Sequence, residues 1–294
     1  MDKEKISQIY DKSYKILLVI TLLIFIFGMG YLYSFAKTHG DIIDKDITLS
    51  GGTSIQVNSQ TDIQKLESAL SEKFEDFSIR QISNILTGEQ IAVIIETSAP
   101  HEEIKSFLEN YLGIELTSEN SSIEFTGSTL SDSFYNQLRF AIALAFIFMA
   151  IVVFIIFRTF IPSLAVVFAA FSDIVLTLTT VNLLGIKMST AGIVAFLMLI
   201  GYSVDTDILL TTRVLKRRGT PINERIYGAF KTGITMSLTS LSVVVVGLIL
   251  TLNFSKVFSQ IFTILTIGLI FDIFNTWLGN ASLIKLYAEK KHLH

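Results

Sequence analysis

Residues 189–211 read STAGIVAFLMLIGYSVDTDILLT, an apolar run that contains two aspartates, Asp205 and Asp207. As a helix, a run of this length crosses the ~30 Å hydrocarbon core of a membrane. Five further apolar runs of similar length lie on either side of it, at residues 16–35, 140–157, 163–184, 232–252 and 257–278. The sequence therefore predicts an α-helical integral membrane protein with six transmembrane helices.

The composition of the 294-residue chain supports this class. Hydrophobic residues make up 51% and charged residues 17%, whereas charged residues reach about a quarter of an ordinary soluble domain. The absence of cysteine excludes disulfides, thiolate metal sites and cysteine nucleophiles. No metal centre is expected, because the histidines all lie outside the apolar runs: His39, His101, His292 and His294. No Gly-x-x-x-x-Gly-Lys loop indicates ATP use.

The distribution of basic residues predicts the orientation. Lysine and arginine gather before the first run, in the loop 213–231 and in the tail 285–294, whereas the alternate short loops carry only Lys187 and Lys256. By the positive-inside rule, both termini are expected in the cytoplasm of a multi-pass protein of the cytoplasmic membrane. We interpret the first run as a retained helix rather than a cleaved signal peptide, because no small-residue cleavage site follows Phe35.

These assignments divide the chain into a cytoplasmic segment 1–15, a first helix 16–35, an outer domain 36–138, a helical bundle 139–284 and a cytoplasmic tail 285–294. The basic loop 213–231 either anchors the topology at anionic lipid headgroups or contacts a partner protein. The outer domain holds 17 Asp and Glu against 6 Lys and Arg. That acidity either attracts positively charged polypeptide or keeps the domain soluble.

The outer domain has the pattern of a small α+β fold. Strands are expected from Ile55 and over 122–126, and a hairpin over 77–86 and 91–96 turns at Thr87-Gly88. Helices are expected after Asp62 and from Pro100 to Gly113. The resulting order, βαββαβ, is that of a ferredoxin-like domain, placed between the first two transmembrane helices.

Four acids inside apolar runs are the main candidates for function: Asp173, Asp205, Asp207 and Asp272. An ionised carboxylate near the bilayer centre costs about 2.5–3.5 kcal/mol even on the lenient insertion scale. Asp205 and Asp207 lie about 200° apart on a helix, so they cannot share one face. Either the acids are inert, bonded to Ser and Thr hydroxyls or paired with Arg213 and Lys231, or they mark a proton pathway.

The fifth run carries hydroxyls on one helix face, at Thr232, Thr235, Thr239 and Ser242. Small hydroxylated residues in this spacing form a close helix–helix seam or line a hydrated route. Both interpretations stay open from the sequence.

Several stretches together resemble the SecD/SecF family of protein-export membrane proteins, in its SecF branch. The segment Gly201-Tyr202-Ser203-Val204-Asp205-Thr206-Asp207, followed by Arg213, is similar to the family's fourth transmembrane helix. Gly51-Gly52-Thr53 resembles a motif just outside the first helix. Ser172-Asp173 resembles the acid of the third helix, and Lys231-Thr232 falls where bacterial members have Arg-Thr. The Asp-Thr-Asp form resembles the archaeal branch, and the resemblance covers most of the chain.

The resemblance implies a subunit of the resistance-nodulation-division superfamily that works with SecD beside the Sec channel. It implies that preproteins are helped across the membrane by the proton-motive force, with protons as coupling ion, no other cofactor, no catalysis and no nucleic acid. The bacterial proton-linked acid aligns with Thr206 here, so either Asp205 or Asp207 inherits the role. Asp272 has no bacterial counterpart.

We hypothesise that Asp205, together with Asp173, takes up protons from outside and releases them inside, tuned by Lys231 or Arg213. Three other classes compete with this hypothesis. A proton-coupled small-solute transporter of the same superfamily shares the buried acids, although the chain has half the usual helices. An intramembrane aspartyl protease could use Asp173 and Asp205 but lacks the Gly-x-Gly-Asp context. A structural assembly factor would need none of the acids.

Overall fold

The computed structural model describes residues 3–74, 77–83, 87–216, 219–252 and 255–292. Arg217 and Arg218 of the basic loop, His294 of the tail and the end of the predicted hairpin strand over 84–86 lie outside the described residues. Within the described part, six helical stretches are long and apolar enough to cross a membrane. The predicted six-helix class therefore agrees with the structure.

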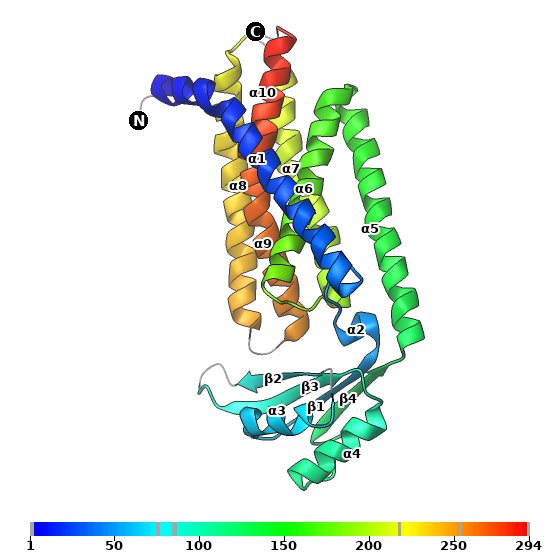
Figure 1. The fold of residues 1–294 in the computed structure, drawn as a ribbon. Coiled ribbons are helices and arrows are strands. Elements are labelled where there is room, and N and C mark those ends of the chain that lie inside the picture. Colours follow the sequence, from blue (N-terminus) through cyan, green and yellow to red (C-terminus); the bar gives the residue numbers. More distant parts are fainter. Residues whose placement is uncertain (1–2, 75–76, 84–86, 217–218, 253–254, 293–294) are drawn as a thin grey trace.

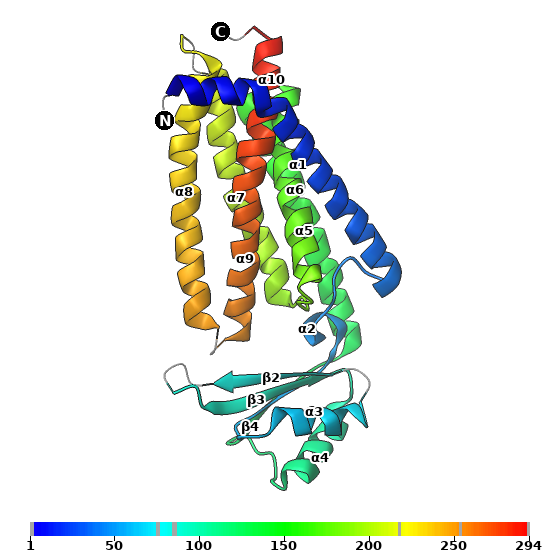
Figure 2. The same ribbon diagram turned by 60° about the vertical axis from the view of Figure 1, so that its left-hand side comes forward.

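The membrane bundle is built from long helices that run side by side (Figure 1). In chain order its elements are α1 (Lys3–His39), α5 (Ser128–Phe157), α6 (Phe160–Leu183), α7 (Thr190–Lys216), α8 (Ile222–Thr251), α9 (Lys256–Phe274), the π-helix η1 (Asn275–Asn280) and α10 (Ala281–Lys290). Both described ends of the chain lie at one end of the bundle, and the first turns of α1 cross that end (Figure 2). An α/β domain lies at the opposite end.

Several helices are longer than the apolar runs that predicted them. The first helix extends beyond 16–35 at both ends, and the sixth continues through η1 and α10 to Lys290. The fifth begins at Ile222, directly after Pro221, ten residues before its apolar run. Hydropathy detects only the part of a helix with apolar side chains, whereas backbone hydrogen bonding continues into amphipathic turns.

The α/β domain consists of α2 (Ile47–Ser50), β1 (Gly52–Val57), α3 (Ile63–Ser71), β2 (Phe77–Ser83), β3 (Gln90–Thr97), α4 (His101–Leu112) and β4 (Ser121–Thr126). After α2, this is the predicted βαββαβ order. The strands are arranged β2-β3-β1-β4, and every neighbouring pair is antiparallel. The predicted caps are present: the Asp62 side chain accepts from two backbone N–H groups of α3, and Gly113 ends α4 in the left-handed conformation.

The core of this domain fills the space between the sheet and its two helices. Ile55 and Ile95 from adjacent central strands pack with Leu66 of α3 and Ile104 of α4, and all four side chains are at most 1% exposed. Burying a large aliphatic side chain contributes roughly 1.5–3 kcal/mol relative to leaving it exposed. The domain therefore has its own hydrophobic core, separate from the bundle.

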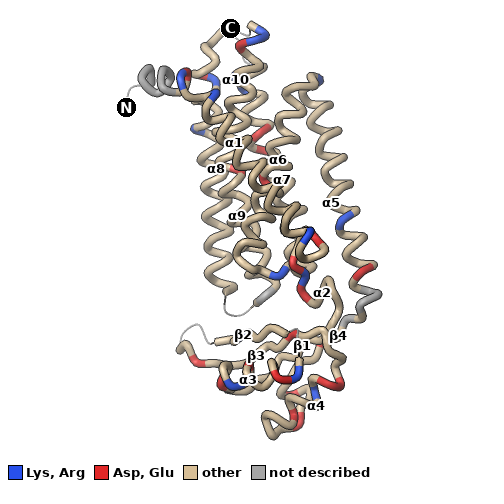
Figure 3. The backbone as a smooth tube through the Cα atoms, in the orientation of Figure 1, with Lys and Arg blue, Asp and Glu red and all other residues tan. Residues whose placement is uncertain are grey.

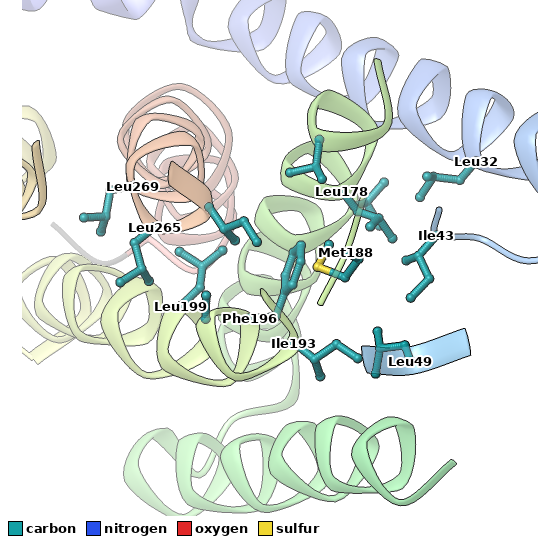
Figure 4. Packing of buried hydrophobic residues seen from close by; sticks show 14 of the residues in the cluster. Leu32, Ile43, Leu49, Leu178, Met188, Ile193, Phe196, Leu199, Leu265 and Leu269 are labelled. Atoms are coloured by element: carbon teal, nitrogen blue, oxygen red, sulfur yellow. The ribbon is translucent and has the colours of Figure 1, made fainter. Parts of the chain in front are cut away.

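A short joint connects the domain to the bundle. Lys45 and Met188 form a β-bridge, in which Asp46 N–H donates to Met188 O at 2.9 Å and Met188 N–H donates to Asp44 O at 2.6 Å. The Thr190 N–H, at the start of α7, donates to the Thr48 hydroxyl at 3.1 Å. Figure 4 shows Leu49 of α2 beside the side chain of Ile193. The chain before β1 is thus fixed to the loop between α6 and α7.

Polar contacts tie the same joint to α5. The Asp41 carboxylate accepts from Lys45 at 2.9 Å and from the Tyr135 hydroxyl at 3.0 Å. Partial burial opposes ionisation of Asp41, but these contacts and the Ile42 N–H outweigh it and hold the pKa of Asp41 below its ordinary value. Asp41 is therefore a carboxylate at neutral pH and links α1 to α5.

The Gly-Gly-Thr motif forms the turn from the joint into the sheet. Gly51 and Gly52 have φ of 82° and 142°, a region that L-residues rarely adopt. The Thr53 hydroxyl, which is completely buried, donates to Ala99 O at 2.7 Å. A Cβ on Gly52 would lie 2.5 Å from the Thr97 carbonyl oxygen. The motif therefore allows β1 to pass close to the end of β3.

We expect Gly52→Ala to lower the thermal unfolding temperature of the detergent-solubilised chain, because strain of this kind costs about 1–3 kcal/mol. Gly30→Ala in α1 is the matched control, since a Cβ there meets nothing within 4 Å. The control should be neutral or slightly stabilising. Equal unfolding temperatures for the two variants would contradict this role for Gly52.

Candidate functional site: a buried carboxylate cluster

Three of the four membrane acids come together inside the bundle. Asp173 of α6, Asp207 of α7 and Asp272 of α9 are at most 1% exposed. Acidic backbone positions are visible among the bundle helices as well as over the α/β domain (Figure 3). Buried carboxyl groups need hydrogen-bonding partners from within the protein. The partners define the site.

Asp173 is held by a donor at each carboxylate oxygen. The Ser203 hydroxyl of α7 donates to Asp173 Oδ2 at 2.5 Å, and Asn275 Nδ2 donates to Oδ1 at 2.6 Å. The Asn275 amide also donates to the Ser172 hydroxyl at 3.1 Å. These contacts suit a carboxylate, which only accepts hydrogen bonds when it is ionised.

Asp207 and Asp272 share one hydroxyl group. Thr276 Oγ1 lies 3.0 Å from Asp207 Oδ1 and 3.4 Å from Asp272 Oδ1. A threonine hydroxyl has a single proton, so it can donate to only one of the two carboxyl groups. Both contacts are hydrogen bonds only when one of the two acids is protonated and donates to the Thr276 oxygen. The geometry therefore provides a place for a transferable proton.

The other hydrogen bonds to Asp207 and Asp272 also come from uncharged donors. Asn280 Nδ2 donates to Asp207 Oδ1 at 2.6 Å, and the Thr206 hydroxyl approaches Asp272 Oδ2 at 3.3 Å. Asp207 Oδ2 is buried and has no hydrogen-bond partner among the described residues. Asp207 is thus less completely satisfied as an anion than Asp173.

The π-helix η1 supplies three of these partners. Asn275, Thr276 and Asn280 come from this one element, which interrupts the α-helical path between α9 and α10. Asn275 and Asn280 are five residues apart, which would place them about 140° apart on an α-helix. The i→i+5 winding of a π-helix brings residues five apart onto one side. Both amides can therefore reach the acid cluster.

Within the described residues, no lysine or arginine forms an ion pair with any acid of the cluster. Arg213 instead donates to the Gly228 carbonyl at 2.5 Å and so joins α7 to α8. Lys231 is exposed on α8. The ion pairs with Arg213 and Lys231 considered from the sequence are not formed, and a charge on the cluster has no basic partner in the described chain.

The structure does not bring Asp205 to the cluster. Asp205 is exposed on α7, on a different face from Asp207, as expected from their spacing. Gly201 and Tyr202 are exposed as well, whereas Ser203 faces inward to Asp173. The proton hypothesis and the protease alternative both combined Asp173 with Asp205. In the structure Asp173 is buried with Asp207 and Asp272, and Asp205 is exposed.

The hydroxyl face of α8 also points outward. Thr235, Thr239 and Ser242 are exposed, and each hydroxyl donates to the backbone carbonyl one turn earlier in its own helix. Thr232, the first residue of the stripe, is half-buried and donates to Gly228 O at 3.4 Å. The three exposed hydroxyls line no route within the described part of the chain. They lie where another molecule in the membrane would meet α8.

Comparison with known proteins identifies the relationship. The family model "Protein export membrane protein SecD/SecF, C-terminal" matches residues 108–290. A SecF protein of Methanothermobacter thermautotrophicus is 40% identical over 252 residues, which are 84% of this chain and 85% of that protein. This chain belongs to the SecF family of protein-export membrane proteins. A SecF protein of Methanocaldococcus jannaschii is 37% identical and covers 94% of this chain, with 96% of its own length matched.

Solved SecDF structures share the fold. The crystal structure of SecDF from Thermus thermophilus, a translocon-associated membrane protein, superimposes with a TM-score of 0.72 at 19% identity. The match covers 95% of the SecF-family chain but only 38% of that SecDF chain. SecDF in its super-membrane-facing form gives a TM-score of 0.55 at 18% identity, over 96% of this chain. The chain is therefore a multi-pass membrane protein with a SecDF-like fold.

Sequence reasoning missed the amide partners in this SecF-family chain. Asn275, Thr276 and Asn280 lie in or beside the sixth apolar run, and polar residues in such a run were the signal that could have identified them. In a continuous α-helix the two asparagines would lie on different faces. Only the π-helical winding of η1 places both against the acids.

We expect Asn275→Ala to destabilise the detergent-solubilised protein by about 1–3 kcal/mol, because Asp173 would lose its Nδ2 donor in a buried site. The single tryptophan, Trp277, lies in η1 and provides a local fluorescence signal for unfolding. Thr239→Ala, an exposed position, is the control and should change stability by less than about 0.5 kcal/mol. Combining Asn275→Ala with Asp173→Asn should cost less than the two single changes together. Strict additivity would contradict the contact.

Proposed function

We propose that this protein is the SecF subunit of a SecDF accessory complex, which promotes preprotein export across the cytoplasmic membrane by using the proton-motive force. Protons are the coupling ion, with no other cofactor, and the subunit carries out no catalysis. The observation that supports this proposal best is the Thr276 hydroxyl shared between Asp207 and Asp272. The hydroxyl can form hydrogen bonds with both carboxyl groups only when one of the two acids carries a proton.

In this proposal, protonation changes the hydrogen bonds among three helices. A proton on the Asp207–Asp272 pair removes a charge that has no basic partner among the described residues, and its loss restores repulsion between the acids. One elementary charge moved across the membrane is worth about 2.3 kcal/mol per 100 mV. That free energy is enough to shift a two-state equilibrium between helix arrangements by more than tenfold at ~100 mV.

The proposed orientation places both termini in the cytoplasm and the domain 36–138 outside. The described basic residues of the tail and of the loop 213–231 lie toward the end of the bundle where the termini meet, away from the α/β domain (Figure 3). Positive charge on cytoplasmic loops is the strongest known determinant of membrane orientation. The same surface would contact anionic lipid headgroups.

The joint offers a mechanical link between the cluster and the outer domain. The first residue of α7, Thr190, is hydrogen-bonded to Thr48, and the same helix carries Ser203 and Asp207. A shift of α7 on protonation would therefore displace the chain that leads into β1. The outer domain would then grip or release an emerging preprotein beside the Sec channel.

Polar groups on the outer surface of the bundle support a SecD partner. Asp205 and Tyr202 on α7, and Thr235 and Thr239 on α8, are exposed in the isolated chain. A carboxylate facing lipid is costly, so Asp205 favours contact with another protein. The Thermus SecDF chain is much longer than the part matched here, which fits a second, SecD-like half.

We expect Asp207→Asn to reduce proton-motive-force-dependent export of a secreted reporter by roughly tenfold or more, since a buried acid of this kind carries the coupling proton. Membrane insertion of the variant should be unchanged by immunoblot. Asp205→Asn is the matched comparison, two residues away on the exposed face. It should retain more export than Asp207→Asn, because it alters a contact at the surface and leaves the buried acids intact. Export at the wild-type rate with Asp207→Asn would refute the proton role.

We expect tagged wild-type chain to co-purify with SecD from mild detergent, and Thr239→Phe to reduce the recovery because the ring would obstruct packing of a partner helix at α8. Val152→Phe, at a position 52% exposed on α5, tests whether any added ring has this effect. A monodisperse wild-type protein without SecD would contradict the heteromer and favour a small-solute transporter.

A further inference from the structure

The acid cluster borders buried polar atoms for which the described chain supplies no hydrogen bond. They are Asp207 Oδ2, Asn280 Oδ1 and Thr211 Oγ1. Asp207 and Thr211 are 0% exposed and Asn280 is 4% exposed. Buried polar atoms almost always have a partner, and where the protein provides none the partner is water. These atoms therefore mark places where water belongs.

Thr211 follows Asp207 by one helical turn. The two residues are four apart on α7, so they lie on one face and differ by about 6 Å in depth. Lys216, the last residue of α7, lies about 7.5 Å further along the axis. Thr211 therefore stands midway between the carboxyl group of Asp207 and the basic end of the helix.

Thr211 differs from other threonines of the bundle in what its hydroxyl does. A hydroxyl in a membrane helix normally donates to the carbonyl four residues earlier. That bond is made at Thr177, Thr179, Thr180, Thr235, Thr239, Thr263 and Thr266. The Thr211 hydroxyl does not make it, so both its proton and its lone pairs are available to water.

A small cavity lies beside the amides of the cluster. It has a volume of about 20 Å³ and lies between α1, α6 and the η1–α10 segment. Its polar lining comes from Thr21, Ser172, Asn275 and Asn280. A buried water needs roughly 10–15 Å³ and two to four polar partners. The cavity is large enough for one water, but its surface is mainly apolar, and neither Asp207 nor Thr211 lines it. It is therefore separate from the space between those two side chains.

We propose that Thr211 is a proton-transfer residue, which connects Asp207 to the basic end of α7 through water bound between Asp207 Oδ2 and the Thr211 hydroxyl. This inference rests on the proposed proton role of the cluster and adds the route by which the proton leaves. The neighbouring side chains Leu210 and Val214 are completely buried in an apolar cluster. They offer no polar group, whereas the Thr211 hydroxyl lies on the same face of α7 as Asp207 and has no partner among the described residues, so we assign the route to Thr211.

The transfer conserves atoms and charge at every step. The step begins with the proton of the Asp207–Asp272 pair on Asp207 Oδ2, while Oδ1 accepts from Asn280. The O–H bond at Oδ2 breaks as the proton passes to the bound water, and the carboxylate is left behind. The water passes one of its own protons to the Thr211 oxygen, which releases its original proton to water at the basic end of the helix. The water and the threonine are unchanged when a second proton has been taken up by Asp207.

The absence of native cysteine makes this route testable by thiol labelling in inverted membrane vesicles. Thr211→Cys is nearly the same size as the native residue. We expect a small charged methanethiosulfonate added at the cytoplasmic face to modify Thr211→Cys about tenfold faster than Val214→Cys, because only a hydrated thiol ionises readily. Val214 is equally buried and three residues nearer the basic end, so depth alone predicts the opposite order. Equal or slower modification at residue 211 overturns the proposal.

Export provides the second measurement. Thr211→Val should reduce proton-motive-force-dependent export several-fold, and Thr211→Ser, which restores the hydroxyl, should recover it. Wild-type export with an inserted Thr211→Val variant overturns the proposal. Thiol labelling does not depend on export. Rapid labelling of Thr211→Cys would still support a bound water at this position, whereas normal export by Asp207→Asn would refute the proton role of the cluster.

Discussion

A carboxyl group inside a lipid-embedded bundle has to find its hydrogen bonds within the protein, and this requirement governs the structure around the bundle centre. Asp173, Asp207 and Asp272 are surrounded by hydroxyl and amide groups rather than by cations. Neutral donors stabilise a charge less strongly than a salt bridge, so they leave the protonation state of the cluster free to change. A buried lysine or arginine would have fixed it.

The two ends of the molecule are held by different forces. The α/β domain has an apolar core of its own around Ile55 and Ile95, whereas its connection to the bundle is made by a β-bridge at Met188 and by the Asp41 carboxylate. The core is dense and does not deform gradually. The joint contains a few directional hydrogen bonds, so motion between the two parts is expected there rather than within the domain.

Much of the architecture follows from local patterns. The six apolar runs predicted the helices, and Asp62, Pro100 and Gly113 predicted the limits of α3 and α4, because length, hydropathy and capping are local properties. The four acids were identified for the same reason, since a charge in an apolar run needs no tertiary information to be noticed.

Local sequence patterns could not show which of Asp205 and Asp207 faces the inside of the bundle. Helical spacing showed that they face opposite ways, but which face is inside depends on the position of α9 and η1. The π-helix was also hidden, because nothing in the residue types of 275–280 distinguishes its i→i+5 winding from that of an α-helix. Geometry of this kind has to be observed.

Because Thr190 is hydrogen-bonded to Thr48 of the joint, the first turn of α7 is attached to the chain that leads into the α/β domain. From Thr190 to Asp207 the helix rises about 25 Å, and it has no proline within its bounds. A rotation of α7 by a few degrees would displace Thr190 sideways. It would also change the distances between the Asp207 carboxyl group and its hydrogen-bond donors. Under the proposed function, pulling on the α/β domain would therefore alter the proton affinity of the cluster, and a load on an exported chain would regulate the coupling that drives it.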